Sequence, residues 1–169
     1  MSDLVDLEQA DQKSASGGKA TTAAITKAAN RLPLRQIVEV FSGGTPSRKE
    51  PAFWNGGVPW FSPKDLRTAV LDDSEEHLTE HAIASGRARE LPAGTVLVVV
   101  RGMILARRVP IALTTVSGAI NQDVKALRPR PGLLPEFLLI ALQAQERELQ
   151  RAVGTAAHGT KKLDLDDLL

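Results

Sequence analysis

The sequence contains no cysteine and few aromatic residues, which make up 4% of its 169 residues. Without cysteine the chain can form no disulfide and no thiolate metal site, and its histidines (His77, His81 and His158) are too dispersed to predict a zinc site. No run of about 18 apolar residues is present, so we expect no membrane span. Residues 1–4 lack the basic and apolar start of a secretory signal, and together these absences favour a cytoplasmic protein.

Catalytic motifs are also missing. The sequence has no Asn/Asp-Pro-Pro-aromatic methyltransferase motif, no P-loop, no glycine-rich cofactor loop after a predicted strand and no Ser-His-Asp arrangement. Asp164, Asp166 and Asp167 beside Lys161 and Lys162 would suit a nuclease, but this pattern is more typical of a solvated helix start. We therefore expect a protein that is not an enzyme, with no catalytic residue, no cofactor and no metal.

The net charge is only +1, so the chain is not a polycation that coats nucleic acid without selectivity. The charges are nevertheless segregated. Between residues 101 and 130 the only acid is Asp123, whereas acids gather at residues 72–76 and 164–167. This pattern predicts one basic face and one acidic face.

Residues 43–66 are rich in glycine, proline and aromatic side chains. We expect them to form an ordered loop that is neither helix nor strand, because glycine and proline interrupt both. In this prediction the loop turns at Gly43, Gly44, Gly57 and Pro59, and the buried rings of Trp54 and Trp60 anchor it. The polar groups that it would present are hydroxyls and cations, which suit phosphates and base edges: Thr45, Ser47, Arg48, Lys49, Ser62 and Lys64.

The remaining pattern predicts an α+β fold, with short helices packed on a twisted, mostly antiparallel sheet and long ordered loops. We expect residues 1–31 to be a flexible N-terminal extension and residues 32–169 to form one domain. The predicted helices are 33–41, 79–85 and one long helix from Pro135 to Gly154, and the predicted strands are 95–100, 104–106, 109–113, 116–120 and 124–127.

Several motifs in this order resemble a known family. They are Gly43–Ser47, Phe53-Trp54, Gly56–Trp60, Pro63–Leu66, Leu91–Val96, Val100–Gly102, Asn121-Gln122, Lys125–Leu127, Leu134–Leu138 and Gly154-Thr155. Together they resemble one target recognition domain of the specificity (S) subunit of type I restriction–modification enzymes, over residues 32–169. The sequence departs from the family pattern at Met103–Arg108, where a short Thr-Ile-Gly turn is usual, and it lacks the spacer helix that follows such a domain.

The resemblance implies a half-length, non-catalytic specificity module that reads a short half-site in double-stranded DNA. It further implies a partner methyltransferase subunit, which methylates adenine at N6, and a restriction subunit, with a second recognition domain or a second copy of the chain as a further partner. The DNA-binding residues that we expect are Thr45, Ser47, Arg48, Lys49, Ser62, Lys64, Arg101, Arg107, Arg108, Thr155, His158, Thr160, Lys161 and Lys162.

Two alternatives remain open at this point. The chain could be the recognition domain of a fused single-chain restriction–methylation enzyme, or a non-catalytic remnant that acts as a decoy or interaction protein. The bases that such a module would read do not follow from the sequence.

Overall fold

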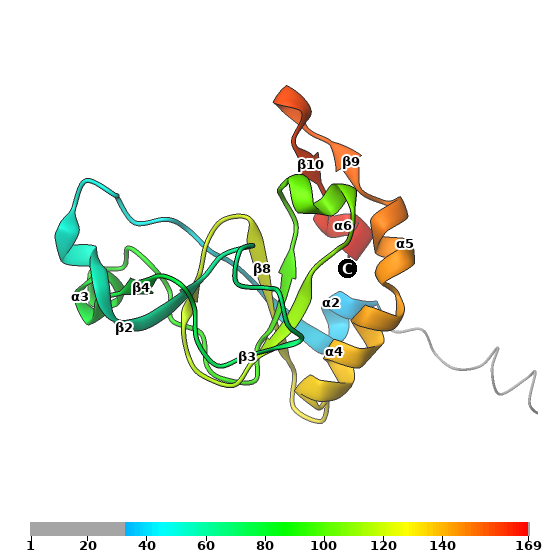
Figure 1. The fold of residues 1–169 in the computed structure, drawn as a ribbon. Coiled ribbons are helices and arrows are strands. Elements are labelled where there is room, and N and C mark those ends of the chain that lie inside the picture. The colour runs from blue at the N-terminus through cyan, green and yellow to red at the C-terminus, as the bar shows by residue number, and fades with distance from the viewer. Residues whose placement is uncertain (1–32, 169) are drawn as a thin grey trace, which may run out of the picture. The chain divides into compact units, whose positions relative to one another are not determined.

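A five-stranded mixed sheet lies at the centre of the computed structural model, which describes residues 33–168 (Figure 1). The extension predicted for residues 1–31 lies outside the described residues. The strand order is β1-β8-β5-β6-β3, and every neighbouring pair is antiparallel except β3 with β6. The strands are β1 (Val38–Ser42), β3 (Val70–Leu71), β5 (Val96–Val99), β6 (Ile111–Thr114) and β8 (Val124–Pro129). All four residues of β5 are buried, as its β-branched run predicts.

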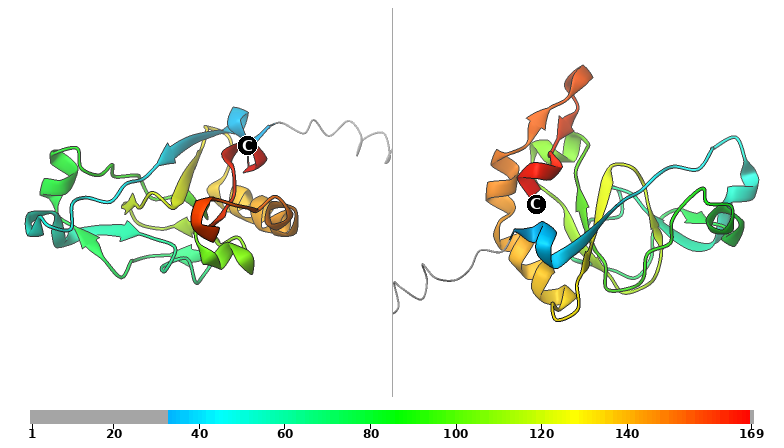
Figure 2. Two further views of the ribbon diagram at one scale, coloured as in Figure 1. Left: turned by 90° about the horizontal axis from the view of Figure 1, so that it is seen from above. Right: turned by 180° about the vertical axis from the view of Figure 1, so that it is seen from behind.

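Two consecutive helices lie along one side of this sheet (Figure 2). Helix α4 (Pro135–Ala144) buries Leu138, Leu139 and Leu142 in the core, and α5 (Glu146–Arg151) follows it. The prediction of one continuous helix is wrong at Gln145, which has φ −98° and ψ 4°. A tertiary contact accompanies the break, because the Glu146 carboxylate accepts a hydrogen bond from the backbone N–H of Val109 at 3.2 Å. Shorter helices near the two ends of the described residues are α2 (Leu34–Ile37) and α6 (Leu165–Leu168).

The helix predicted over residues 33–41 is mostly wrong, because only α2 is helical and β1 follows it directly. Apolar spacing over so short a run fits a helix or a strand equally well. Pairing with β8 decides between them, with Phe41 opposite Ala126 and Ser42 opposite Lys125. The chain then enters the loop at residues 43–49 in an extended conformation, without the left-handed glycine cap that would end a helix.

A three-stranded sheet lies at the end of the domain away from α4 and α5 (Figures 1 and 2). Its order is β4-β2-β7, where β2 pairs antiparallel with β4 and parallel with β7. The strands are β2 (Trp54–Phe61), β4 (His77–Leu78) and β7 (Ala119–Ile120), accompanied by η1 (Pro51–Phe53) and α3 (Glu80–Ala84). Helix α3 is confirmed where the sequence predicts it, with Thr79 as its N-cap.

Strand β2 contradicts the expectation that Gly56 and Gly57 would prevent a strand. A β-bulge accommodates them, because Trp54 and Val58 both pair with Leu78. Asn55 in the bulge has a φ of 63°, and Gly56 approaches β4 so closely that a Cβ atom there would lie 2.4 Å from the Leu78 carbonyl oxygen. The glycines therefore bend the strand without ending it.

Two further segments differ from the sequence-based expectation. Residues 104–106 form part of a 3₁₀ turn, η2 (Met103–Ala106), instead of a strand, because Gly102 (φ 131°) turns the chain before it. The loop expected at residues 154–162 is a hairpin of β9 (Gly154–Thr155) and β10 (Lys161–Lys162), with η3 (Ala157–Gly159) at its tip. The α+β class is confirmed, and within residues 33–168 no helix has the length and apolar character needed to cross a membrane.

Candidate functional site

The loop at residues 43–49 is held by two buried tryptophans. Trp54 and Trp60 are 9% and 3% exposed, and their rings meet edge to face with centroids 5.2 Å apart. The indole N–H of Trp54 donates to the carbonyl oxygen of Ser47, and that of Trp60 donates to the carbonyl oxygen of Gly44, each at 3.1 Å. The rings thus fix the backbone at both ends of the segment 44–47, whose Thr45 and Ser47 side chains are exposed.

Gly43 packs against the turn that follows β7. A Cβ atom at residue 43 would lie 2.1 Å from the carbonyl oxygen of Ile120, and the N–H of Gly44 donates to that same oxygen at 3.0 Å. At Gly44 and Gly57 a Cβ atom would meet no other atom within 4 Å, so of these three positions only residue 43 requires glycine for steric reasons. Pro59 is half-buried in β2, and Gly118 passes close over it.

Arg48 is engaged by the tryptophans. Its guanidinium carbon lies 3.7 Å from the centre of the Trp54 ring, and the group forms a two-pronged ion pair with Glu76. The hydrogen bond from Arg48, more than the charge itself, lowers the pKa of the Glu76 carboxyl. The structure therefore gives Arg48 partners within the fold, although the sequence favours it as a DNA contact.

Lys64 and Ser62 also have surroundings that the sequence did not predict. Lys64 lines a shallow pocket whose other side chains include Asp65, Asp73 and Glu75. Ser62 is buried, and its hydroxyl donates to the Asp65 carboxylate at 2.9 Å. Arg48 and Lys64 thus lie beside the acidic segment 73–76, where the predicted segregation of charge does not hold.

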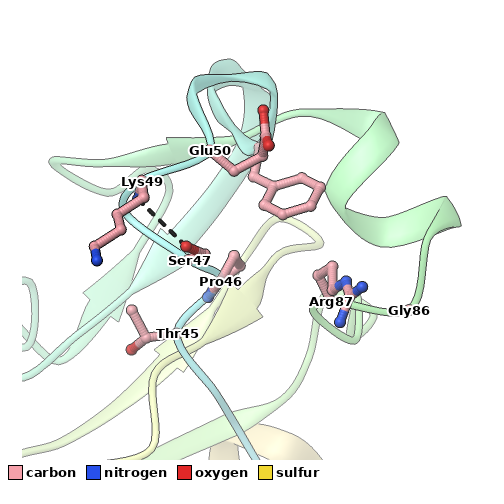
Figure 3. Close-up of a pocket in the computed structure, with 8 residues that line it drawn as sticks. Thr45, Pro46, Ser47, Lys49, Glu50, Gly86 and Arg87 are labelled. Atoms are coloured by element: carbon pink, nitrogen blue, oxygen red, sulfur yellow. Dashed lines mark hydrogen bonds between the residues drawn. The ribbon is translucent and has the colours of Figure 1, made fainter.

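Thr45, Ser47 and Lys49 are exposed and line one side of a pocket of about 550 Å³ (Figure 3). The turn after α3 contributes Gly86 and Arg87 on the other side. The Thr45 hydroxyl donates to the side-chain carbonyl of Gln122 at 2.5 Å, which ties the loop to the turn between β7 and β8. The pocket is completed by Pro46, Glu50 and Phe53.

A second group of polar side chains lies where β1 ends, β5 ends and β8 begins. We call it the sheet-end cluster: Ser42, Arg101, Asp123 and Lys125. The Lys125 ammonium donates to the Ser42 hydroxyl at 2.5 Å, and the Arg101 guanidinium lies 3.9 Å from the Asp123 carboxylate. Burial, and then the nearby charge of Arg101, lower the pKa of Lys125.

The sequence did not single out Ser42, Gln122 or Lys125 as binding residues. In the sequence Lys125 belongs to the basic region at residues 101–130 and to the motif Lys125–Leu127, but neither feature predicts a contact for it. Its neighbours Val124 and Ala126 become fully buried in β8. Its position beside β1 depends on the pairing of two strands that lie far apart in the sequence. Sequence reasoning therefore located the basic region and missed its central residue.

The hairpin β9–β10 is joined to the sheet-end cluster. Arg101 and Lys162 form an antiparallel bridge, and the N–H of Gly102 donates to the carbonyl oxygen of Lys161 at 3.0 Å. Within the hairpin the Lys161 ammonium donates to the Thr155 hydroxyl at 2.9 Å, and Lys162 pairs with Asp164. The five predicted site residues that share this hairpin are Thr155, His158, Thr160, Lys161 and Lys162, with His158 exposed near its tip.

Arg107 and Arg108 follow η2 and differ in their contacts. Arg108 donates from its guanidinium to the carbonyl oxygen of Leu66 at 3.1 Å, which ties this segment to the turn after β2. Arg107 is exposed, and no carboxylate whose side chain is described pairs with it. Of the two, only Arg107 has a guanidinium without a partner in the described fold.

The arrangement provides cations, hydroxyls and one exposed amide, held on rigid backbone. Such groups bind anions and hydrogen-bonding edges, whereas nucleophilic or acid–base catalysis needs an activated pair. Within residues 33–168 no group of histidine and acidic side chains has the geometry to hold a metal ion. The cations, hydroxyls and amide at this surface are groups that suit the binding of anions and hydrogen-bonding edges.

Comparisons with known proteins identify the fold and the family. The model of the type I restriction modification DNA specificity domain matches residues 30–169. The specificity subunit of the type I restriction enzyme EcoR124I/EcoR124II from Escherichia coli is 33% identical over 132 residues, which are 78% of this chain and 33% of that protein. The MjaIX specificity subunit from Methanocaldococcus jannaschii is 32% identical over 111 residues, which are 62% of this chain and 24% of that protein.

A solved structure shares the fold. The HsdS subunit from Thermoanaerobacter tengcongensis superposes with a TM-score of 0.56 at 18% identity, over 96% of this chain and 44% of that one. The chain thus spans a third or less of the length of the two specificity subunits that it matches in sequence. With a family match that runs from residue 30 to residue 169, the chain belongs to the type I restriction–modification DNA specificity domain family.

Proposed function

We propose that the domain is a DNA-reading module of a type I restriction–modification system. In this proposal it binds a short half-site in double-stranded DNA and is not itself an enzyme. It directs a partner methyltransferase subunit, which methylates adenine at N6, and a restriction subunit. The family match supports the type of system, and the relatives named as specificity subunits support the role in selecting DNA.

The observation that carries the proposal is a chain of contacts that unites three segments. Thr45 bonds to Gln122 in the turn before β8, Asp123 in that turn faces Arg101, and Arg101 bridges to Lys162 in the hairpin. These contacts link the start of the loop at Thr45 and the hairpin at Lys162 to the end of the five-stranded sheet where Arg101 and Asp123 lie. Cations there suit phosphates, while the hydroxyls and the amide suit base edges.

The expected strength of binding follows from the size of the module. A single module of this kind buries on the order of 600–1,000 Å² against DNA, and each base pair that it reads correctly contributes roughly 1–3 kcal/mol. With only a few readable base pairs, one copy should select sequences modestly above a salt-sensitive background. Stronger selection would then require a second recognition domain or a second copy of the chain.

Two measurements test the proposal. The first is selection of duplexes that bind the purified chain from a random-sequence pool, which should enrich a short motif. The second is incubation of the chain with S-adenosylmethionine and duplex DNA, with and without a type I methyltransferase subunit. We expect methyl transfer only when that subunit is present, and enrichment of no motif would contradict the proposed reading of a half-site.

The two measurements have separate consequences for the proposal. Methyl transfer by the chain alone would show that it is catalytic and would overturn the specificity role. Binding without any enriched motif would instead leave a module that contacts DNA through phosphates only.

A further inference from the structure

Lys125 is a half-buried lysine on an interior strand of the sheet, whereas lysine side chains are usually exposed. It lies near the start of β8, a strand that pairs with β1 on one side and β5 on the other, so its backbone is fixed from both sides. Val124 and Ala126 on either side of it are fully buried, and the lysine itself is half-buried. A cation on an interior strand is held in place far more rigidly than a lysine on a loop.

The charges around Lys125 do not balance. Its ammonium donates to the neutral hydroxyl of Ser42, and among the side chains that the structure describes no carboxylate pairs with it. The second cation of the cluster, Arg101, lies no closer than 3.9 Å to Asp123, whose single carboxylate is the acid of this cluster. Lys125 therefore lies near a second cation, Arg101, and the one carboxylate of the cluster is paired with Arg101 alone, at 3.9 Å.

This imbalance makes the charged form of Lys125 less favourable in the folded protein. Burial and the charge of Arg101 both lower the pKa of Lys125, which means that the charged form is disfavoured in the folded protein. An anion placed between the two cations would reverse both effects. The unused donors of the ammonium and the guanidinium are the groups that phosphate oxygens accept from.

We propose that Lys125 and Arg101 together hold one backbone phosphate of the DNA, with Ser42 orienting the ammonium. The inference rests on the proposed function and adds a positioned contact that fixes the module on the duplex. Because a phosphate contact carries no sequence information, this site should act equally on every duplex. It would set the register from which the side chains at residues 45–49 reach the bases.

The test measures binding of the full chain to a random-sequence duplex by fluorescence anisotropy over a range of salt concentrations. Lys125→Met should weaken binding by about tenfold. The slope of log affinity against log salt should become less steep by about 0.9, the value for one phosphate. The matched control is Arg130→Gln, which removes an exposed cation just beyond the other end of β8 and should leave the slope unchanged.

The pairing of the two cations has its own test. Arg101→Gln should also weaken binding, but the double variant should lose no more than about 0.9 in slope, because one phosphate is released. A loss of about twice that value would show two separate phosphates and overturn the shared site. The two variants should also select the same motif as the wild type, if any is selected.

Stability separates this role from a structural one. Lys125→Met removes a disfavoured charge, so it should melt at or above the wild-type temperature, and a clear fall in melting temperature would overturn the assignment. An unchanged salt slope in a normally melting Lys125→Met variant would overturn this site while leaving the proposed function standing. If the wild-type chain binds no duplex at all, the proposed function fails and this inference fails with it.

Discussion

Arginine is used in two opposite ways in two regions of this domain. In the tryptophan region, formed by the loop 43–49 with β2 and β4, Arg48 stacks on Trp54 and pairs with Glu76. In the sheet-end cluster, Arg101 stands next to another cation and 3.9 Å from its only acid. The first region satisfies its cation internally, and the second leaves its cations available to a ligand.

The difference teaches that charge alone does not mark a binding residue. A cation with a stacked ring and a carboxylate already has its interactions, and a phosphate would have to compete with both. A cation beside a second cation is repelled by it, and a bound anion would offset that repulsion. The predictions below test this distinction, beginning with the tryptophans that hold the first region together.

Trp60→Ala should cause the largest loss of stability. The ring is 3% exposed, packs on Trp54 and donates to the Gly44 carbonyl oxygen, so its removal leaves a cavity and an unpaired acceptor. We expect the free energy of unfolding to fall by about 3–5 kcal/mol, measured by denaturant titration. Phe137→Ala is the control, because that ring is 63% exposed and its loss should change stability little. A variant that melts normally but loses DNA would instead make Trp60 a contact residue.

Gly43→Ala should come next, with a cost of about 1–3 kcal/mol or more, because the new Cβ would overlap the carbonyl oxygen of Ile120 at 2.1 Å. The neighbouring substitution Gly44→Ala is the matched control, since nothing lies within 4 Å of its Cβ position. Thermal melting of the two variants measures the difference. Equal melting temperatures would show that the loop does not need its close approach to the turn after β7.

The sequence predicted those parts of the fold that depend on neighbours in the chain. Helix α3 needs only Thr79 as its cap, and β5 needs only its own β-branched residues, so both lie where expected. The sequence favours a helix where β1 lies, because the pairing of β1 with β8 involves residues some 85 positions away, as from Phe41 to Ala126. Strand β2 was missed because the bulge that accommodates its glycines depends on Leu78.

The same reason limits what the sequence says about the candidate site. The loops that carry the hydroxyls and cations were identified, and their binding of DNA stays a prediction. The sequence could not tell Arg48 from Arg107, because the partner of Arg48 is Glu76, which lies 28 residues further along the chain, just before β4. Lys125 was passed over because its half-buried place beside Arg101 is created by the sheet.

Arg48→Met tests whether the tryptophan region is structural. Loss of the stacking and of a partly exposed ion pair should lower stability by about 1 kcal/mol and leave the salt slope of DNA binding unchanged. A less steep slope would instead place Arg48 on the DNA and break the contrast with Arg101.

The same variant has a pH signature. The pKa of Glu76 is lowered in the folded state by the hydrogen bond from Arg48, so this pair stabilises the fold above the unfolded pKa of the carboxyl. That stability is lost as the pH falls through the folded pKa. The gap in melting temperature between wild type and Arg48→Met should therefore narrow below about pH 4.5. A gap that stays constant down to pH 3 would show that the ring stacking, and not the ion pair, accounts for the effect.

Arg107→Ala should have the smallest effect on stability. Its comparison with Arg108→Ala tests the same distinction between two neighbouring arginines. Arg107 is exposed and pairs with none of the carboxylates that the structure describes, so its removal should leave the melting temperature unchanged. If it contacts a phosphate, the salt slope should fall by about 0.9 for every duplex tested. Arg108→Ala should behave differently, because it removes the hydrogen bond to the Leu66 carbonyl oxygen and should cost about 1 kcal/mol of stability. If Arg108→Ala changes the slope and Arg107→Ala does not, then a cation with a partner in the fold can still bind DNA, and the rule drawn from Arg48 and Arg101 is wrong.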